Sequence, residues 1–502
     1  MILSKANLSH IKTGDIQLPG AGTFDLPEKV LQFGTGVLLR GLPEYFIDKA
    51  NKAGVFNGRV VVVKSTAKGS ADNFDLQDSL YTIAVRGIEN GQKTEENIIS
   101  SAIIRVINAA TAWNDVLRVA CSEDLEIVIS NTTEAGIELT DDNIHLSPPN
   151  SFPGKLLSVL YERYKRFGGD EHRGLIILPT ELISDNGKVL KKIVFALAEQ
   201  NNLEPDFLSW LERANTFCNT LVDRIVPGKP DKEMSTKLEE DLGYSDELLI
   251  IAESYKLWAI EGDETVKRAL SFAEVDSGVI IVPDIALFKE LKLRLLNGSH
   301  TLTCGVAILA GYETVNTAMT DALFSEFITN MLQRNLCPGI PYPVDAEQAS
   351  QFSSNVLDRF RNPFIRHQWI SISSNYTLKI KMRVVPILLR YYEIFNLVPE
   401  YISFGFAAYL LIMRSEERGA NFEGKSPGGI YKIDDENARY YSNLWVSAKS
   451  LGELVTTSLS NVQLWGADLS VLPGFAESVK GYLETIQEVG VVEAMKRINS
   501  KR

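Results

Sequence analysis

Short apolar runs rich in β-branched residues alternate with helical patterns along the first half of the chain, and this alternation restricts the fold more than any other feature. The clearest run is residues 59–66, where four consecutive valines stand between charged and polar residues. Strands of a parallel sheet are covered on both faces, so continuous apolar runs separated by helices predict an α/β, doubly wound parallel sheet. The other strand candidates are residues 29–36, 78–87, 125–136, 173–183 and 275–284.

The pattern changes near residue 277, beyond which the sequence is mostly helical. A chain of 502 residues is too long for one hydrophobic core. We therefore expect an α/β domain over residues 1–277 and an all-α domain over residues 278–502. Ligand sites favour domain interfaces, so the active site is expected in the cleft between the two.

The charge and the cysteines exclude several classes of function. A net charge of −13 makes nucleic acid or an anionic membrane an unfavourable partner, and an anionic substrate would need its own basic pocket. The four widely spaced cysteines suit reduced thiols in the cytoplasm and form no pattern typical of a zinc site. The longest apolar stretch, residues 402–413, is too short to span a membrane and predicts a buried helix. Oligomeric state is left open.

A glycine pair follows the first predicted strand. Gly34 and Gly36 flank Thr35, and Val37 and Leu38 begin a helical pattern. Such a turn lets a pyrophosphate approach the backbone at a helix N-terminus. The third glycine of the usual motif is absent, so an ordinary strand-to-helix turn is an equally good interpretation. The second strand ends in Lys64 rather than an acidic residue, which leaves NAD and NADP both open.

Lys292, Asn297 and His300 form the most informative spacing in the second half. On an ideal α-helix these three side chains fall in one sector. Ketone reduction needs a proton donor at the developing alkoxide, and a lysine with a lowered pKa serves in both directions. Gly298, inside this helix, suggests that something approaches the backbone closely. The alternative is a solvated lysine, a capping asparagine and a core histidine.

The pattern KxxxxNxxH resembles the polyol-specific long-chain dehydrogenases, a family that includes mannitol dehydrogenase. The resemblance extends along nearly the whole chain. It implies a Rossmann-like N-terminal domain, a helical C-terminal domain, and the use of NAD without a metal. The segments that carry it are GTGVLLR (34–40), NTTEAGI (131–137), FCNTLVDRIV (217–226), KLRLLNGSH (292–300) and RFRNPFIRHQ (359–368).

The resemblance also implies roles for single residues. Lys292 would be the catalytic acid and base, and Asn219 and Asn297 would polarise the carbonyl or hold the alkoxide. His300 would bind a substrate hydroxyl, and Lys379 would contact the substrate. The residues expected to bind the cofactor are Gly34, Thr35, Gly36, Val37, Leu38, Thr132, Glu134 and Ala135.

Within the family, the chain is most similar to the branch that reduces tagaturonate. His367 stands where polyol-specific members have an acidic residue, and Ser371 where an arginine is usual. Both differences fit a substrate that carries its own carboxylate, for which Arg366, His367 and Lys379 are candidate partners. Arginine pairs with carboxylates in a bidentate manner, although a surface arginine is more often only solvated.

The expected activity is therefore the interconversion of D-tagaturonate and D-altronate by hydride transfer with NAD. The same chemistry on fructuronate and mannonate, or on a neutral ketose and its polyol, is the nearest alternative. A non-catalytic sugar-acid-binding protein would have no need for an acid and base at Lys292. A phosphosugar substrate is disfavoured because the sequence offers no additional basic cluster for a phosphate.

Overall fold

The computed structural model describes residues 1–12, 14, 16–65, 72–132, 136–419 and 421–500. The chain divides into two compact units. The first unit comprises Met1–Gly87 and Lys93–Ile285, and the second comprises Ile88–Gln92 and Ala286–Arg502. The division comes after Ile285 rather than at residue 277, because β13 pairs in parallel with β12 and so belongs to the first unit.

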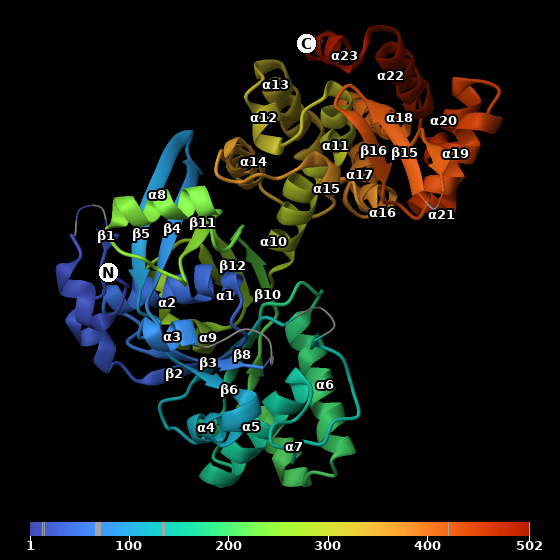
Figure 1. Ribbon diagram of the computed structural model, residues 1–502. Helices are drawn as coiled ribbons and strands as arrows, with labels where there is room; N and C mark the ends of the chain where they lie inside the picture. The colour runs from blue at the N-terminus through green and yellow to red at the C-terminus, as the bar shows by residue number, and fades with distance from the viewer. Residues whose placement is uncertain (13, 15, 66–71, 133–135, 420, 501–502) are drawn as a thin grey trace. The chain divides into compact units, whose positions relative to one another are not determined.

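A sheet of six parallel strands forms the centre of the first unit, in the order β6-β3-β2-β7-β8-β9 (Figure 1). The chain runs outward from β2 through β3 to β6, then returns to the other side of β2 and continues through β7 to β9. This is the order of a doubly wound sheet, with its reversal point between β2 and β7. The predicted fold class is confirmed. The strands are β2 (Glu28–Phe33), β3 (Arg59–Lys64), β6 (Ile103–Asn108), β7 (Ile127–Ser130), β8 (Ile176–Pro179) and β9 (Thr216–Phe217).

The valine run explains why this sheet is covered on both faces. All of β3 is buried, and successive side chains of a strand point to opposite faces. Val60 and Val62 belong to a core that includes residues of α2 (Pro43–Lys52), whereas Val61 and Val63 belong to one that includes residues of α4 and α5. The other helices of the first unit are α1 (Val37–Gly41), α3 (Asp72–Leu76), α4 (Ala109–Ala120), α5 (Phe152–Phe167), α6 (Asn186–Gln200), α7 (Pro205–Ala214), α8 (Lys232–Leu242) and α9 (Glu264–Ala269).

Two of the predicted strands lie outside the doubly wound sheet. Residues 78–87 contribute to β4, which continues through Asn90 and Gly91 into β5; both connecting residues have positive φ, as a tight hairpin turn requires. A parallel neighbour would instead have needed a long crossover connection. The run at 275–284 forms β13 in a smaller sheet. The two further sheets contain β1 (Ile16–Gln17), β5 (Gln92–Ser100), β4 (Tyr81–Glu89) and β11 (Ile250–Glu253), and β10 (Thr220–Asp223), β12 (Leu257–Glu261) and β13 (Val279–Val282).

The second unit is largely helical, as expected, but it also contains the antiparallel sheet β14-β15-β16 (Figure 1). The apolar stretch at 402–413 forms most of α18, which is buried nearly all round. None of the helices in the described ranges is long and apolar enough to cross a membrane. The elements are α10 (Ala286–Leu291), α11 (Gly298–Ala310), α12 (Val315–Met319), α13 (Ala322–Met331), α14 (Ala346–Arg361), α15 (Trp369–Ile372), α16 (Tyr376–Arg383), α17 (Val385–Phe395), α18 (Glu400–Ile412), β14 (Glu416–Arg418), β15 (Asn421–Ser426), β16 (Gly429–Ile433), α19 (Ala438–Ser447), α20 (Leu451–Leu459), α21 (Val462–Trp465), α22 (Phe475–Val489) and α23 (Val491–Asn499).

Helices α11 and α18 pack closely through glycines. A Cβ atom added at Gly405 would lie 2.3 Å from Cδ1 of Leu302, and one added at Gly305 would lie 3.2 Å from the backbone of Ala408. Neither distance leaves room for a methyl group at its normal contact distance. Because α11 also carries His300, this packing fixes the position of a candidate site residue.

We expect Gly405→Ala to lower the free energy of unfolding by about 1–3 kcal/mol, the usual cost of overpacking a core. Gly481→Ala on α22 is the matched control, since a Cβ there meets no atom within 4 Å. It should stabilise the protein by about 0.5–1 kcal/mol through the lower entropy of the unfolded chain. Denaturant unfolding of both variants measures this difference. Equal effects of the two substitutions would contradict the close packing of α11 against α18.

Candidate active site

The glycine turn lies at the point where the strand order of the doubly wound sheet reverses. Gly34 has a φ of +120°, and a Cβ there would come within 2.9 Å of the backbone oxygen of Asn131, just after β7. Glycine is therefore required at this position. Gly36 precedes α1, and a Cβ added to it would meet no atom of the described residues within 4 Å. An open backbone beside this reversal point suits a dinucleotide.

A buried polar network supports the turn from the side of α2. The Nε2 atom of Gln32 donates to the backbone oxygen of Gly34 (3.1 Å) and to Oε1 of Glu44 (2.7 Å). The hydroxyl of Tyr81 donates to Oε2 of Glu44 at 2.5 Å. Burial raises the pKa of the Glu44 carboxyl. The sequence reading missed these residues, although a glutamine within an apolar strand was a visible signal.

The segment after β7 is held by a second buried carboxyl. The backbone nitrogen and Oγ1 of Thr132 donate to Oε1 of Glu181 at 2.8 and 3.1 Å, and Oγ of Ser130 donates to Oε2 at 3.2 Å. Burial raises the pKa of Glu181. Thr132 is thus fixed at the carboxyl end of β7, next to the glycine turn. Glu134 and Ala135, also expected to bind the cofactor, lie outside the described residues.

Asn219 is oriented by its neighbours in the first unit. Its Oδ1 accepts from the backbone nitrogen of Lys188 (3.1 Å), and its Nδ2 donates to Oε2 of Glu261 (3.0 Å). The Oδ1 atom is therefore already used in a hydrogen bond within the protein. The Nδ2 atom has a second N–H that these two hydrogen bonds do not use. This orientation suits an asparagine that donates a hydrogen bond.

Lys292 and Asn297 occupy a π-helical turn between α10 and α11. The expectation of a regular α-helix is therefore wrong at this point. In an α-helix, residues five apart are separated by about 140° around the axis. A π-helix closes its hydrogen bonds from i to i+5, so Lys292 and Asn297 lie roughly one turn apart on the same side. The turn therefore places these two candidate site residues closer together around the helix axis than the α-helical pattern implied.

Gly298 does not mark a close approach to the backbone. A Cβ added there would lie at least 3.6 Å from its nearest neighbours, which is ordinary van der Waals contact. None of the described residues therefore comes close enough to require glycine at this position.

His300 is buried in an aromatic setting. Its ring stacks on Phe360, with the ring centroids 4.0 Å apart, and meets His367 edge-on at 5.1 Å. Burial, followed by the nearby basic groups, lowers the pKa of His300 well below its usual range, so the ring is neutral. Its Nε2 has no hydrogen-bond partner among the described residues. A buried ring nitrogen without a partner is costly in a folded protein unless a ligand provides one.

Basic side chains gather around His300, and we call them the basic cluster. Burial and the charge of Arg383 lower the pKa of Lys379, and burial together with the charges of Lys379 and Arg359 lowers the pKa of His367. Lys379 donates from Nζ to the backbone oxygen of Ile372 at 2.9 Å. The cluster concentrates positive charge within an acidic chain. Its members are His300, Arg359, His367, Lys379 and Arg383.

Two of the three side chains expected to bind the substrate, His367 and Lys379, belong to this cluster. Arg366 is placed differently: its side chain is 75% exposed and its NH2 atom lies 2.8 Å from Oε1 of Glu313. The sequence reading did not single out Arg359 or Arg383. A lysine and an arginine four residues apart on one helix, Lys379 and Arg383, were the available signal.

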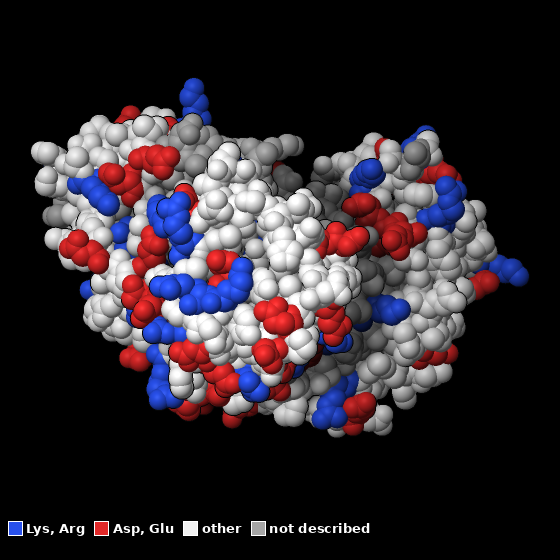
Figure 2. Space-filling view, turned by 90° about the horizontal axis from the view of Figure 1, so that it is seen from below, with Lys and Arg blue, Asp and Glu red and all other residues white. Residues whose placement is uncertain are grey.

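On the face shown in Figure 2, acidic and basic side chains are interspersed.

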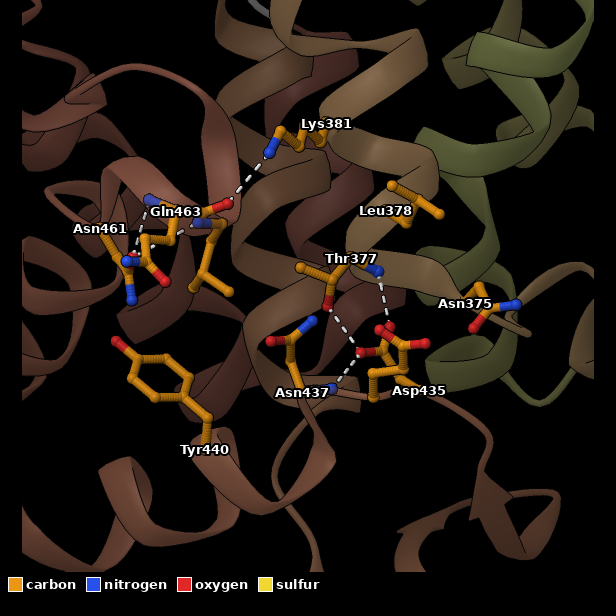
Figure 3. A pocket seen from close by; sticks show the side chains of 11 residues that line it. Asn375, Thr377, Leu378, Lys381, Asp435, Asn437, Tyr440, Asn461 and Gln463 are labelled. Carbon is orange, nitrogen blue, oxygen red and sulfur yellow. Dashed lines mark hydrogen bonds between the residues drawn. The ribbon is translucent and has the colours of Figure 1, made fainter.

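A pocket of about 400 Å³ lies beside α16, and Thr377 and Lys381 of this helix line it (Figure 3). Asp435 in its wall accepts hydrogen bonds from the backbone and hydroxyl of Thr377, so this carboxylate caps α16. None of the residues that line the pocket belongs to the basic cluster.

Comparison with known proteins gives matches over both units. The Rossmann domain model of the mannitol dehydrogenase family matches residues 28–273, and the model of its C-terminal domain matches residues 284–487. Altronate oxidoreductase from Halalkalibacterium halodurans is 39% identical over 479 residues, which cover 94% of this chain and 93% of that protein. The protein of the same name from Bacillus subtilis is 36% identical over 473 residues, covering 94% and 95%.

Two solved structures share the fold at low sequence identity. Mannitol 2-dehydrogenase from Pseudomonas fluorescens, in a ternary complex with NAD and D-mannitol, is 22% identical with a TM-score of 0.69, and covers 100% of both chains. A D-sorbitol dehydrogenase in substrate-free form is 22% identical with a TM-score of 0.79, covering 99% and 100%. Since the family models span both units and the relatives match nearly the whole length, the chain belongs to the mannitol dehydrogenase family.

Proposed function

We propose that the protein is an NAD-dependent oxidoreductase that interconverts D-tagaturonate and D-altronate. The observation that carries the proposal is the basic cluster around His300, because a keto-uronate brings a carboxylate that such a cluster can bind. The relatives named altronate oxidoreductase support the same substrate. Four free thiols and a small sugar-acid substrate suit the cytoplasm.

The first unit would hold the nicotinamide cofactor. The residues present fit it: a Cβ at Gly34 would meet the backbone after β7, and Gly36 leaves its backbone open. Thr35, Val37 and Leu38 complete this turn, and Thr132 flanks it. When bound, the cofactor supplies or accepts the hydride.

The second unit would supply the proton. Lys292 would donate it to the carbonyl oxygen during reduction and accept it during oxidation. Asn297, brought beside Lys292 by the π-helical turn, would donate an amide hydrogen bond to the same oxygen, and Asn219 would do so from the first unit. The neutral ring of His300 would pair its Nε2 with a substrate hydroxyl. Lys379 and His367 would face the carboxylate end of the substrate.

Fructuronate and mannonate are the second candidate pair, because they offer the same carboxylate and differ in stereochemistry. A neutral ketose is less well matched, since it offers no carboxylate to the basic cluster. Rates of NADH oxidation with tagaturonate, fructuronate and fructose separate the three cases. The proposal predicts the highest kcat/KM for tagaturonate. A higher value for fructose would overturn it.

Lys292→Ala should lower kcat on the order of 10²–10⁴-fold, the usual contribution of general acid and base catalysis. NADH binding should be unchanged, because the lysine belongs to the second unit. Lys480→Ala, on the exposed face of α22, provides a control for the loss of a lysine. Initial rates and NADH fluorescence titration measure both effects. Near-normal turnover in Lys292→Ala would remove this residue from the mechanism.

The enzyme should prefer NADH to NADPH, although β3 ends in Lys64 rather than in an acidic residue. The solved relative that contains NAD supports this expectation. The ratio of kcat/KM for the two cofactors tests it. A preference for NADPH would indicate that Lys64 accepts the 2′-phosphate, and Lys64→Ala should then reverse that preference.

Stability should fall in acid because His300 is held neutral. In the unfolded chain a histidine binds its proton near pH 6.5, whereas the folded-state pKa of His300 lies well below that value. The unfolded state therefore binds more protons below pH 6.5, and stability present above that pH is lost as pH falls. His300→Gln should flatten this decline between pH 7 and 5, while exposed His172→Gln should not. Identical profiles for His300→Gln and wild type would show that His300 titrates normally.

A further inference from the structure

Two arginines, Arg294 and Arg383, lie near the C-terminal end of α16. Only the first of them is paired with a carboxylate. Arg294 donates from Nε to Oε2 of Glu290 at 2.8 Å, and from NH1 to the backbone oxygen of Met382 at 2.5 Å. Its charge is balanced by a carboxylate of the same helical stretch, four residues earlier. Arg294 therefore has a structural role, because it joins that stretch to the end of α16.

Arg383 has no such counter-charge. Its NH1 donates to Oγ1 of Thr301 at 3.0 Å, a neutral acceptor. No Asp or Glu oxygen of the described residues lies within 4.0 Å of its guanidinium. The side chain is partly buried, and burial lowers the pKa of the guanidinium. A partly buried charge that is paired only with a hydroxyl is unfavourable until an anion reaches it.

The position of Arg383 is set by the candidate active site itself. Thr301 follows His300 on α11, and its hydroxyl donates to the backbone oxygen of Asn297 at 2.8 Å. With its proton used in this way, Oγ1 offers a lone pair to Arg383. Lys379 lies one helical turn before Arg383, so both face the same side of α16. Thr377 and Lys381, which line the pocket of Figure 3, lie on the other side of that helix.

We propose that Arg383 determines substrate specificity by pairing with the carboxylate of the sugar acid. This proposal rests on the proposed function and adds the residue that selects a charged substrate. Thr301 holds one end of the guanidinium, which leaves the remaining N–H groups to form charge-assisted hydrogen bonds with carboxylate oxygens. Lys379 adds a second positive charge on the same side of the helix. A neutral ketose would leave Arg383 without an anion.

The first test replaces Arg383 with methionine, which keeps much of the length and removes the charge. KM for tagaturonate should rise about 10–100-fold, which corresponds to the loss of one or more hydrogen bonds to a charged group. KM for NADH should stay within about twofold, as expected for a residue of the second unit. Arg390→Met is the matched control, since Arg390 is exposed on α17 and paired with Glu393. An unchanged KM for tagaturonate in Arg383→Met would overturn the proposal.

A second pair of variants separates charge from folding. Arg383→Lys keeps the charge and loses the bidentate geometry, so its KM should lie between those of wild type and Arg383→Met. Thr301→Val keeps Arg383 and removes the acceptor that holds it, and should also raise KM for tagaturonate. If Arg383→Met does not fold, these two variants test whether Arg383 binds the carboxylate. Wild-type values of KM for both would contradict the role of Arg383.

The proposed function and this proposal fail in different ways. If the wild-type enzyme reduces no keto-uronate, the proposed function is wrong. If it reduces tagaturonate, but Arg383→Met raises KM equally for tagaturonate and for an accepted neutral ketose, only the assignment of Arg383 is wrong. An increase confined to the charged substrate supports both.

Discussion

Positive charge that is removed from bulk water needs a counter-charge, and this requirement governs the second unit. Arg294 meets it with Glu290, whereas Arg383 is bonded to the neutral hydroxyl of Thr301. His300 meets it by remaining neutral, since burial and the surrounding cations lower its pKa. Within the basic cluster, Arg383 has no carboxylate of the described residues within 4.0 Å of its guanidinium. In the proposed function, the carboxylate of a sugar acid would pair with Arg383, which a neutral polyol could not do.

In the first unit, the main constraint on the candidate cofactor turn is steric. Gly34 is confined between the end of β2 and the backbone after β7, so only glycine fits there. Two buried carboxyls, Glu44 and Glu181, hold the segments on either side through hydrogen bonds to Gln32 and Thr132. The candidate cofactor site is thus supported by buried hydrogen bonds from Gln32 and Thr132 to these two carboxyls.

The periodicity of the sequence predicted the local elements of the fold well. The valines at 60–63 predicted a strand buried on both faces, and the glycine pair predicted the turn after β2. The sheet to which a strand belongs is not a local property. β4 and β13 have apolar runs like those of the central sheet, but the turn at Asn90 and Gly91 and the pairing with β12 place them elsewhere. Long-range pairing of this kind leaves little trace in a single sequence.

The candidate site was predicted in part, for a related reason. Lys292, Asn297 and His300 were recognised by their spacing and by family resemblance, yet the π-helical turn that brings the first two together follows from packing and not from the sequence pattern. Arg383 was missed because its significance depends on a missing counter-charge, which only a three-dimensional structure reveals. The roles of these residues in binding and catalysis are proposals that rest on their surroundings.

The most direct test of the central claim is a crystal structure of the enzyme with NAD and altronate bound. The account predicts that the altronate carboxylate lies within hydrogen-bond distance, about 3 Å, of the Arg383 guanidinium. It also predicts that the hydroxyl to be oxidised lies equally close to Nζ of Lys292. A carboxylate that faces solvent, or one bound by residues of the first unit, would contradict the account.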